Sequence, residues 1–506
     1  MHLMEPLFEL SIVLPPRGSR ERLRALHHQL RAAIIEGRLQ PGLKLPPTRS
    51  LAAAFKVSRN TAVMAYSLLS SEGYVTSRHG AGTYVATALP HPPQKKATTI
   101  SPSSDRRLNA FWRRHPRMPD ESSPREYPYN FGLGVPDTAF FPFEEWRRVS
   151  ARVLRSLPKA SATYQPPQGS VALREAIARH VSLTRAVACR ADDIIVTAGA
   201  QQAFDLLARV LVTRRGMVVA LEDPGYPPAR AAFAATGAKL VPVPVDEEGL
   251  VVERLPPQAK VIYVTPSHQF PLGASLSLRR RAALLEFAQA RGAVIIEDDY
   301  DGEFRFGGRP LDALQTLDRA ESVFYVGTFS KSVFPMIRLG FIVSPPWARS
   351  TLLTAKQFTD WHCAVLAQET LAAFISDGLL ARHVRTMRPI YNERRELLLQ
   401  TLQQDFDRWL APLPSSAGLH VTALAKGAFG ADALSIQALG KGIRVASLRG
   451  FHAGKPARQG LIFGYGAIDV AHIRDGLKRL HGLASHSLSR SGYGASSAHP
   501  RRSAIR

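Results

Sequence analysis

Short apolar runs alternate with segments of helical periodicity between residues 194 and 343, and this alternation constrains the fold more than any other feature of the sequence. The runs are three to five residues long and cover 194–196, 217–221, 261–264, 293–297, 323–326 and 341–343. Segments 201–212 and 278–290, which lie between them, have apolar residues at helical spacing. Strands buried on both faces and connected by helices form a mostly parallel sheet, so the sequence predicts an α/β fold.

The residues that follow four of these runs are of the kinds that form a binding site. Ligands of such sheets bind beyond the carboxyl ends of the strands. The four segments read TAGAQ at 197–201, EDPGY at 222–226, EDDYD at 297–301 and GTFSK at 327–331. They bring a glycine-bearing helix start, an aromatic ring, a carboxylate and a lysine to one edge of the predicted sheet.

This combination matches the needs of pyridoxal phosphate (PLP). A carboxylate keeps the pyridine nitrogen protonated, and a lysine amine forms a Schiff base with the aldehyde. The N–H groups of a helix start bind phosphate, and an aromatic ring stacks on the cofactor ring. Each feature alone is common in ordinary turns. The four occur in the expected order, however, with Lys331 following Asp298 by 33 residues, and together they predict a PLP site.

The first 85 residues predict a helix-turn-helix followed by a β-hairpin. The apolar stripe of the first helix is formed by Leu23, Leu26, Leu30 and Ile34. A second helix is expected from its N-cap Thr48 to Phe55, and a third begins after its cap Ser58. The buried face of the third helix is expected to comprise Ala62, Tyr66 and Leu69. The segment that follows, YVTSRHGAGTYV, alternates polar and apolar residues around a glycine-bearing turn, as a wing does.

The exposed start of the third helix suits DNA as a partner. The chain of 506 residues has 65 Lys and Arg against 41 Asp and Glu, and this net charge of +24 favours a polyanion. Arg59 and Asn60 can reach base edges in the major groove, whereas Arg49 is better placed to bind phosphate. His79 at the wing tip can approach the minor groove or the backbone. A small helical domain used for protein docking is the alternative.

Composition elsewhere predicts two unequal domains with flexible flanks. Residues 87–128 are rich in Pro, Ser and charge and predict a basic linker, and residues 484–506 predict a disordered basic tail. Two cysteines, Cys189 and Cys363, exclude a disulfide framework and a four-thiolate zinc site, and no metal site is expected. No apolar run reaches the ~18 residues of a membrane span. No signal peptide is visible, so a cytoplasmic protein without a membrane partner is expected.

The N-terminal segment resembles a known DNA-binding family. EGRLQPGLKLPPTRSLAAAFKVSRNTAVMAYSLLSSEGYVTSRHGAGTYV is similar to the winged helix of GntR-type bacterial repressors, with a domain expected at 20–86. The resemblance implies a double-stranded operator as partner. The DNA contacts that it implies are Arg49, Ser58, Arg59, Thr61, His79 and Gly80.

The remainder resembles PLP-dependent aminotransferases of fold type I. The similar segments are TAGAQQAF, LEDPGYPP, TPSHQFPLG, IIEDDYDGEF and GTFSKSVFPMIRLG. Joined behind a GntR-type winged helix, they identify the chain as a member of the MocR subfamily of bacterial regulators. The resemblance implies a fold type I domain at 129–483, with a small C-terminal α+β subdomain, and a head-to-tail homodimer that is nucleoid-associated when DNA is bound.

Residue roles follow from the same resemblance. Lys331 would form the Schiff base, Asp298 would pair with the pyridinium, Tyr300 would bond the phenolate oxygen and Tyr226 would stack on the ring. The phosphate would be surrounded by Ala200, Gln201, Thr328, Ser330 and Arg338. The enzymes' Asn-Pro-Thr-Gly is replaced here by 270–273, FPLG, so His268 or Gln269 is expected to compensate for the missing Asn.

A second departure bears on function. Ile462 stands where the enzymes have the Arg that binds the substrate α-carboxylate, a role that suits only Arg well. The arginines considered as substitutes are Arg449, Arg458 and Arg474. The sequence therefore favours a PLP-dependent transcription regulator that senses an amine, an amino acid or PLP itself. An active aminotransferase with a DNA-binding module, and a dimerisation scaffold without cofactor, are the alternatives.

Overall fold

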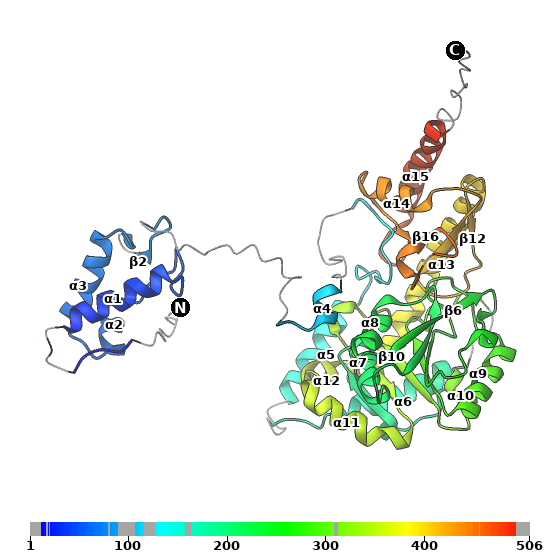
Figure 1. Cartoon of the computed structure of the whole chain (residues 1–506), viewed down its shortest axis with the longest axis horizontal. Coiled ribbons are helices and arrows are strands. Elements are labelled where there is room, and N and C mark those ends of the chain that lie inside the picture. The colour runs from blue at the N-terminus through cyan, green and yellow to red at the C-terminus, as the bar shows by residue number, and fades with distance from the viewer. Residues whose placement is uncertain are drawn as a thin grey trace, which may run out of the picture. The chain divides into compact units, whose positions relative to one another are not determined.

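The computed structural model divides the chain into two compact units, Met1–Pro116 and Arg117–Arg506 (Figure 1). It describes residues 12–16, 19, 21–78, 81–89, 107–115, 127–156, 163–307, 312–454 and 456–491. Within these ranges, no helix is both long and apolar enough to cross a membrane.

The first unit consists of short helices and a two-stranded hairpin. Its elements are α1 (Arg22–Ile35), α2 (Thr48–Ala54), α3 (Arg59–Ser71), β1 (Val75–Arg78), β2 (Gly82–Val85) and α4 (Ala110–Arg114). The two strands pair antiparallel, with Val75 opposite Val85. The predicted helix-turn-helix and hairpin are thus confirmed.

Local chemistry explains where the helices of this unit begin. Ser58 is the N-cap of α3, as predicted, because its Oγ accepts a hydrogen bond from the backbone N–H of Thr61 at 3.0 Å. The prediction that Thr48 caps α2 is wrong, since Pro47 occupies the cap position and Thr48 is the first helical residue. Two consecutive prolines, Pro46 and Pro47, keep the chain extended up to that point. The predicted core face of α3 is confirmed, because Ala62, Tyr66 and Leu69 are all buried.

The second unit is built on an eight-stranded sheet with the order β4-β11-β10-β9-β8-β5-β6-β7. Its strands are β4 (Ile194–Thr197), β5 (Val218–Asp223), β6 (Lys239–Asp246), β7 (Gly249–Leu250), β8 (Val261–Val264), β9 (Val294–Asp299), β10 (Val323–Thr328) and β11 (Gly340–Val343). The five strands from β10 to β6 are parallel, whereas β11 and β7 run antiparallel to their neighbours. All six apolar runs are strands of this sheet, which confirms the α/β prediction.

Helices cover both faces of the sheet (Figure 1). One face carries α7 (Ala200–Leu211), α8 (Pro227–Ala235) and α11 (Pro346–Asp360), whose Phe204, Phe233 and Leu352 pack on Tyr263 and Phe324. The other face carries α6 (Val171–Arg185), α9 (Leu278–Arg291), α10 (Leu314–Leu317) and α12 (Val365–Ser376), with α5 (Phe143–Ser156) against α12. Both faces of the sheet are therefore buried by helices, so a ligand would bind at the ends of the strands.

A smaller antiparallel sheet follows in the chain, with the order β12-β13-β16-β15. Its strands are β12 (Leu410–Pro412), β13 (His420–Ala425), β15 (Ala446–Ser447) and β16 (Gly460–Gly464), and β14 (Ile443–Arg444) pairs separately with β3 (Tyr129–Asn130). The helices of this subdomain are α13 (Leu379–Asp405), α14 (Ala431–Leu439) and α15 (Val470–Ser491). Helix α15 extends into the segment predicted to be a disordered tail, because Leu480 and Ala484 continue its buried stripe.

Candidate functional site

The predicted cofactor residues come from the carboxyl ends of neighbouring strands. Asp298 is the penultimate residue of β9 and Tyr300 is the first residue after it; Lys331 follows β10, and Tyr226 follows β5. Parallel pairing sets Asp298 opposite Val326 of β10. The sheet thus brings carboxylate, lysine and aromatic residues to one edge, as the spacing predicts.

Asp298 is buried and has one oxygen available. Its Oδ2 accepts a hydrogen bond from the Tyr263 hydroxyl of β8 at 2.6 Å, while its Oδ1 is buried with no hydrogen-bond partner among the described residues. Burial raises the pKa of Asp298 to about 7, and the Tyr263 hydrogen bond opposes this shift. An unpartnered buried carboxylate oxygen is costly, and a protonated ring nitrogen would satisfy it. The residues present therefore fit a pyridinium at this position.

Lys331 lies against a glycine segment of the N-terminal part of the same unit. Its ammonium donates to the carbonyl of Gly134, and a Cβ at Gly134, where φ is +68°, would collide with that ammonium. Any other residue at this position would have a strained backbone, and its side chain would occupy the space of the Lys331 ammonium. Glycine therefore leaves room for the lysine side chain at the sheet edge.

A second group of residues surrounds the start of α7 and suits an anion. Gly199, with φ +78°, precedes α7, and a Cβ there would lie 2.8 Å from Nη2 of Arg338. Arg338 donates to the Ala198 carbonyl at 2.9 Å, so its guanidinium lies beside the first N–H groups of the helix. Thr328 ends β10 and its hydroxyl donates to the Ser330 hydroxyl at 3.0 Å. This is the environment in which a phosphate is bound at a helix start.

Gln201 and Ala200 differ in what they offer to such an anion. Ala200 is the first residue of α7, where only the backbone N–H is available. The exposed Gln201 donates its amide to the Pro228 carbonyl at 3.3 Å, across to α8. The predicted roles of both residues remain predictions.

Aromatic rings form a connected layer over the same edge. Phe270 makes edge contacts with Tyr226 and Tyr300, at ring-centroid distances of 5.5 and 5.7 Å. Phe451, from the smaller subdomain, contacts Phe270 at 5.3 Å. The phenylalanine of FPLG thus fills space beside both predicted cofactor tyrosines.

The structure distinguishes the two candidates for the missing Asn. The Gln269 amide is already engaged: Nε2 donates to the carbonyl of Phe270 and, at the end of β5, to Pro224 and Glu222, while Oε1 accepts the N–H of Leu272. His268 instead lies with Nδ1 2.9 Å from the Tyr300 hydroxyl. Of the two residues, His268 is the one in contact with a predicted cofactor residue.

Ile462 lies in an apolar setting. It is fully buried on β16 and clusters with Val245, Leu272 and Leu448. Among the arginines considered as substitutes, Arg449 forms an ion pair with Asp432 at 3.5 Å, and Arg474 is exposed on α15. The third, Arg458, is partly buried and acts on Asp246. The side chain of Ile462 itself offers no hydrogen-bond donor to a carboxylate.

Three residues of this site were not singled out from the sequence. Tyr263 lies in the apolar run 261–264, and its phenol hydroxyl is the only polar side-chain group of that run. Gly134 and Phe451 lie far from the strand ends in sequence, and only the folded chain brings them to Lys331 and Phe270. For Gly134, the sequence did contain one indication: two glycines close together in the segment GLG at 132–134.

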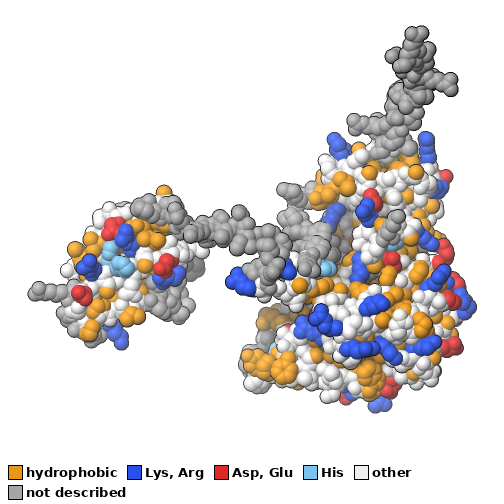
Figure 2. Space-filling model, viewed as in Figure 1, with side chains coloured by type: hydrophobic (Ala, Val, Ile, Leu, Met, Phe, Trp, Pro, Cys, Tyr) orange, Lys and Arg blue, Asp and Glu red, His pale blue; other side chains and the backbone are white. Residues whose placement is uncertain are grey.

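The predicted DNA-contact residues lie around the start of α3. Arg59 and Asn60 are exposed at its first two positions, and Arg49 is exposed on α2. Ser58 and Thr61 are engaged with each other, since their hydroxyls lie 2.8 Å apart in addition to the cap bond. The remaining two, His79 and Gly80, lie outside the described residues. Figure 2 shows Lys and Arg side chains on both units, so positive charge is not confined to this one.

Two family models match the chain. Residues 23–85 match the gntR family of bacterial regulatory proteins, and residues 128–461 match aminotransferase class I and II. These spans agree with the two units of the fold.

Individual relatives have the same two-part organisation or the same larger fold. The chain is 37% identical to the probable rhizopine catabolism regulatory protein MocR of Rhizobium meliloti, over 90% of this chain and 92% of that one. It is 32% identical to the pyridoxine biosynthesis transcriptional regulator PdxR of Corynebacterium glutamicum, over 92% and 97%. Among solved structures, Pyrococcus horikoshii kynurenine aminotransferase superposes with a TM-score of 0.66 at 27% identity, over 71% of this chain and 91% of that chain.

Proposed function

The chain belongs to the MocR-type transcription regulators of the GntR family, and from this premise we propose that it holds PLP at Lys331 and uses that site to control operator binding. The winged helix is the DNA-binding part, and the aminotransferase-like unit is the sensor. In this proposal, PLP occupies the edge formed by the ends of β5, β9 and β10.

The observation that carries the proposal is the unpartnered, buried Oδ1 of Asp298. A ring nitrogen there would be the partner that this oxygen lacks, and Tyr263 would hold the carboxylate in place from its other oxygen. The phosphate would lie at the start of α7 beside Arg338, Thr328 and Ser330. When bound, the cofactor supplies an aldehyde that reacts with primary amines.

Sensing rather than turnover is favoured by the surroundings of Ile462. Because Ile462 is buried among apolar side chains, this position supplies no guanidinium to an α-carboxylate. The effector classes that fit are an amine, an amino acid held in another way, or PLP itself. The relatedness to a pyridoxine biosynthesis regulator is consistent with the last of these.

The runner-up function is an active aminotransferase, which the resemblance to solved aminotransferases supports only at the level of fold and cofactor. Multiple turnovers with an amino acid and an oxo acid would favour it. A single round of binding that alters DNA affinity would favour the sensor.

The regulator is proposed to act as a head-to-tail homodimer. One helix-turn-helix reads one half-site, so two copies are needed for a two-fold operator. An effector need only bind two states of that dimer unequally to change operator affinity. Sedimentation of the purified protein would measure the oligomeric state.

Arg59→Ala is expected to weaken binding to a DNA fragment selected from a random pool by the wild-type protein. The exposed guanidinium at the start of α3 is placed to contact a base, and its loss costs roughly 1–3 kcal/mol if the contact is bidentate. Fluorescence anisotropy at one fixed salt concentration measures the effect, because phosphate contacts make affinity salt-dependent.

Arg24→Ala is the matched control, since Arg24 is exposed on α1 and its loss changes the net charge equally. Competition with scrambled DNA separates base reading from general attraction. A variant Arg59→Ala that keeps wild-type discrimination between the two DNAs would remove Arg59 from the base-reading residues.

A further inference from the structure

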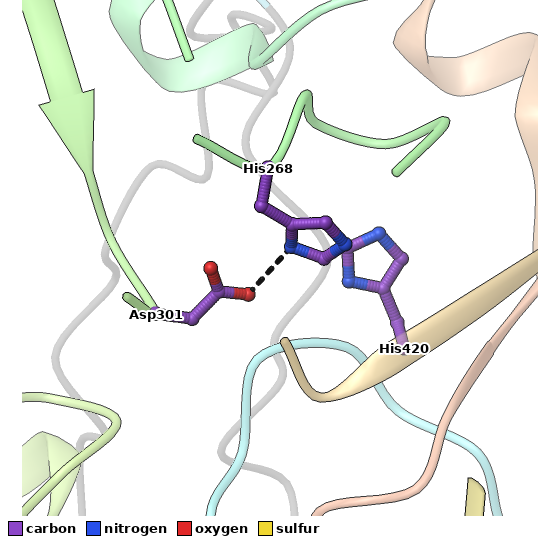
Figure 3. Close-up of side chains that lie close together, drawn as sticks. All are labelled: His268, Asp301 and His420. Atoms are coloured by element: carbon purple, nitrogen blue, oxygen red, sulfur yellow. Dashed lines mark hydrogen bonds and ion pairs between the residues drawn. The ribbon is translucent and has the colours of Figure 1, made fainter. Parts of the chain in front are cut away.

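A buried group of three residues contacts the Tyr300 hydroxyl through His268. His268, Asp301 and His420 are each at most 4% exposed, and their nitrogen and oxygen atoms lie within 4.8 Å of one another (Figure 3). His268 and Asp301 follow β8 and β9 of the large sheet, and His420 begins β13 of the smaller one. Of the hydrogen bonds of these three side chains, the one between His268 and Tyr300 involves a residue assigned to the cofactor, whereas those to Asp301 and to the Pro271 carbonyl do not.

The position of one proton follows from the contacts of His268. Its Nδ1 lies 2.9 Å from Oδ2 of Asp301 and 2.9 Å from the Tyr300 hydroxyl oxygen, whereas Nε2 is buried and has no partner in the described part of the chain. A proton on Nε2 would be a buried unpaired donor, and a bare Nδ1 would face a carboxylate oxygen. The favoured arrangement therefore has the proton on Nδ1, directed to Asp301.

This tautomer determines which way the Tyr300 hydroxyl points. With a proton already on Nδ1 and directed to Asp301, that nitrogen has no lone pair with which to accept the Tyr300 hydroxyl proton. The hydroxyl proton must then point away from His268. Burial raises the pKa of Tyr300 well above its ordinary value, so the hydroxyl keeps that proton.

His420 and Gly418 hold the pair in position. Because the Pro271 carbonyl only accepts, Nε2 of His420 carries a proton and donates to it at 3.0 Å. The His420 ring lies 4.9 Å from that of His268, and burial lowers the pKa of His420 to about 3, so it is neutral. A Cβ at Gly418, where φ is +80°, would collide with both His268 and Asp301. Burial raises the pKa of Asp301, and the nearby Asp299 adds to this effect, whereas His268 and Lys331 oppose it. Lys331 also contributes to the lowered pKa of His420.

Two imidazoles and a carboxylate are also a donor set for zinc. Here, however, Nδ1 of His268 has two hydrogen-bond partners and Nε2 of His420 has one. Ion binding through these atoms would break bonds that the fold already makes; Nε2 of His268 could bind an ion without that cost, but Oδ2 of Asp301 is likewise engaged, with Nδ1 of His268. The contacts therefore favour a hydrogen-bonded relay over a metal site.

Building on the proposed function, we propose that Asp301 and His268 are positioning residues that orient the Tyr300 hydroxyl as a hydrogen-bond donor to the phenolate oxygen of the cofactor. In this way, they partly replace the Asn of the enzymes' Asn-Pro-Thr-Gly segment, which the FPLG segment lacks, in hydrogen bonding to the phenolate oxygen. The order of action is Asp301 to His268 to Tyr300.

The test is a pH titration of the visible absorbance of the full-length protein loaded with PLP. A donor at the phenolate oxygen draws negative charge away from the adjacent lysine nitrogen, so losing it favours the protonated nitrogen. Tyr300→Phe and His268→Phe are each expected to raise the titration midpoint, Tyr300→Phe by about 1 pH unit. In the double variant, His268→Phe is expected to add nothing to the shift of Tyr300→Phe, because it acts through the same hydroxyl.

His383→Phe is the matched control, because His383 is a buried histidine of α13 that packs on Phe141 at 5.2 Å, away from this group. It is expected to leave the midpoint unchanged. If His268→Phe does not fold, as judged by its melting temperature, His268→Asn replaces it with the same expectation.

The outcomes separate the relay from the proposed function. A wild-type protein without a visible band on adding PLP would overturn both. A wild-type band that titrates normally, with His268→Phe unshifted or additive to Tyr300→Phe, would overturn the relay alone. Zinc found stoichiometrically in the purified protein and released by His420→Ala would also overturn it, in favour of a metal site.

Discussion

Lys331→Ala is expected to abolish the visible absorbance band that the wild-type protein develops on addition of PLP. The Lys331 ammonium lies at the carboxyl edge of the sheet, held by the Gly134 carbonyl, and alanine has no amine with which to bind the aldehyde covalently. The expected effect is complete loss of the band. Reduction with borohydride followed by mass spectrometry provides an independent readout, since only a covalent link to the lysine is trapped.

Lys426→Ala serves as the control for this variant. Lys426 is a partly exposed lysine of the smaller subdomain, paired with Asp407 at 2.6 Å, so its loss removes one amine without touching the sheet edge. A wild-type band in Lys331→Ala, or loss of the band in Lys426→Ala, would contradict the assignment of Lys331.

Asp298→Asn is expected to lower PLP affinity by roughly 10- to 100-fold, because a hydrogen bond between charged groups contributes about 1.5–3 kcal/mol. The amide keeps the shape of the side chain but has no negative charge for the ring nitrogen. Equilibrium dialysis against PLP measures the change directly. Because burial raises the pKa of Asp298 to about 7, the unfolded chain releases this proton at a lower pH than the cofactor-free fold does, so stability falls as the pH rises towards 7 and the loss is complete above it. The substitution should therefore not lower the melting temperature above that pH.

Glu297→Gln is the matched control, on the same strand. Glu297 is fully buried, and its carboxylate accepts the backbone N–H groups of Leu314 and Gln315 rather than facing the cofactor edge. Its substitution is expected to reduce stability and leave PLP affinity close to that of the wild type. Equal loss of affinity in both variants would show that Asp298 acts only by supporting the strand.

Much of this fold could be predicted from local patterns. The six apolar runs are strands because each is buried on both faces and bounded by turn residues, and Ser58 caps α3 through a bond only three residues long in sequence. The cap of α2 is also decided locally, since Pro47 takes the cap position and Thr48 becomes the first helical residue. The short strands of the smaller sheet, such as β15, lack a periodic signal of their own.

The residues missed at the site are those that depend on long-range contacts. Tyr263 reaches Asp298 from a neighbouring strand 35 residues away, and Gly134 meets a lysine 197 residues away. His268 was expected to compensate for an absent Asn, but its link to Asp301 depends on how two strand ends turn toward each other. Spacing predicts which side chains share a sheet edge, but the direction in which each points depends on the packed structure.

Operator affinity measured with and without PLP, for wild type and Lys331→Ala side by side, tests the central claim most directly. Coupling between sites of this kind is typically worth 1–3 kcal/mol, or about 5- to 150-fold in affinity. We expect PLP to change the dissociation constant of the wild-type protein for its selected DNA by an amount in that range, and to leave that of Lys331→Ala unchanged. Equal responses of the two proteins, or a wild-type affinity indifferent to PLP and to added amines, would contradict the account.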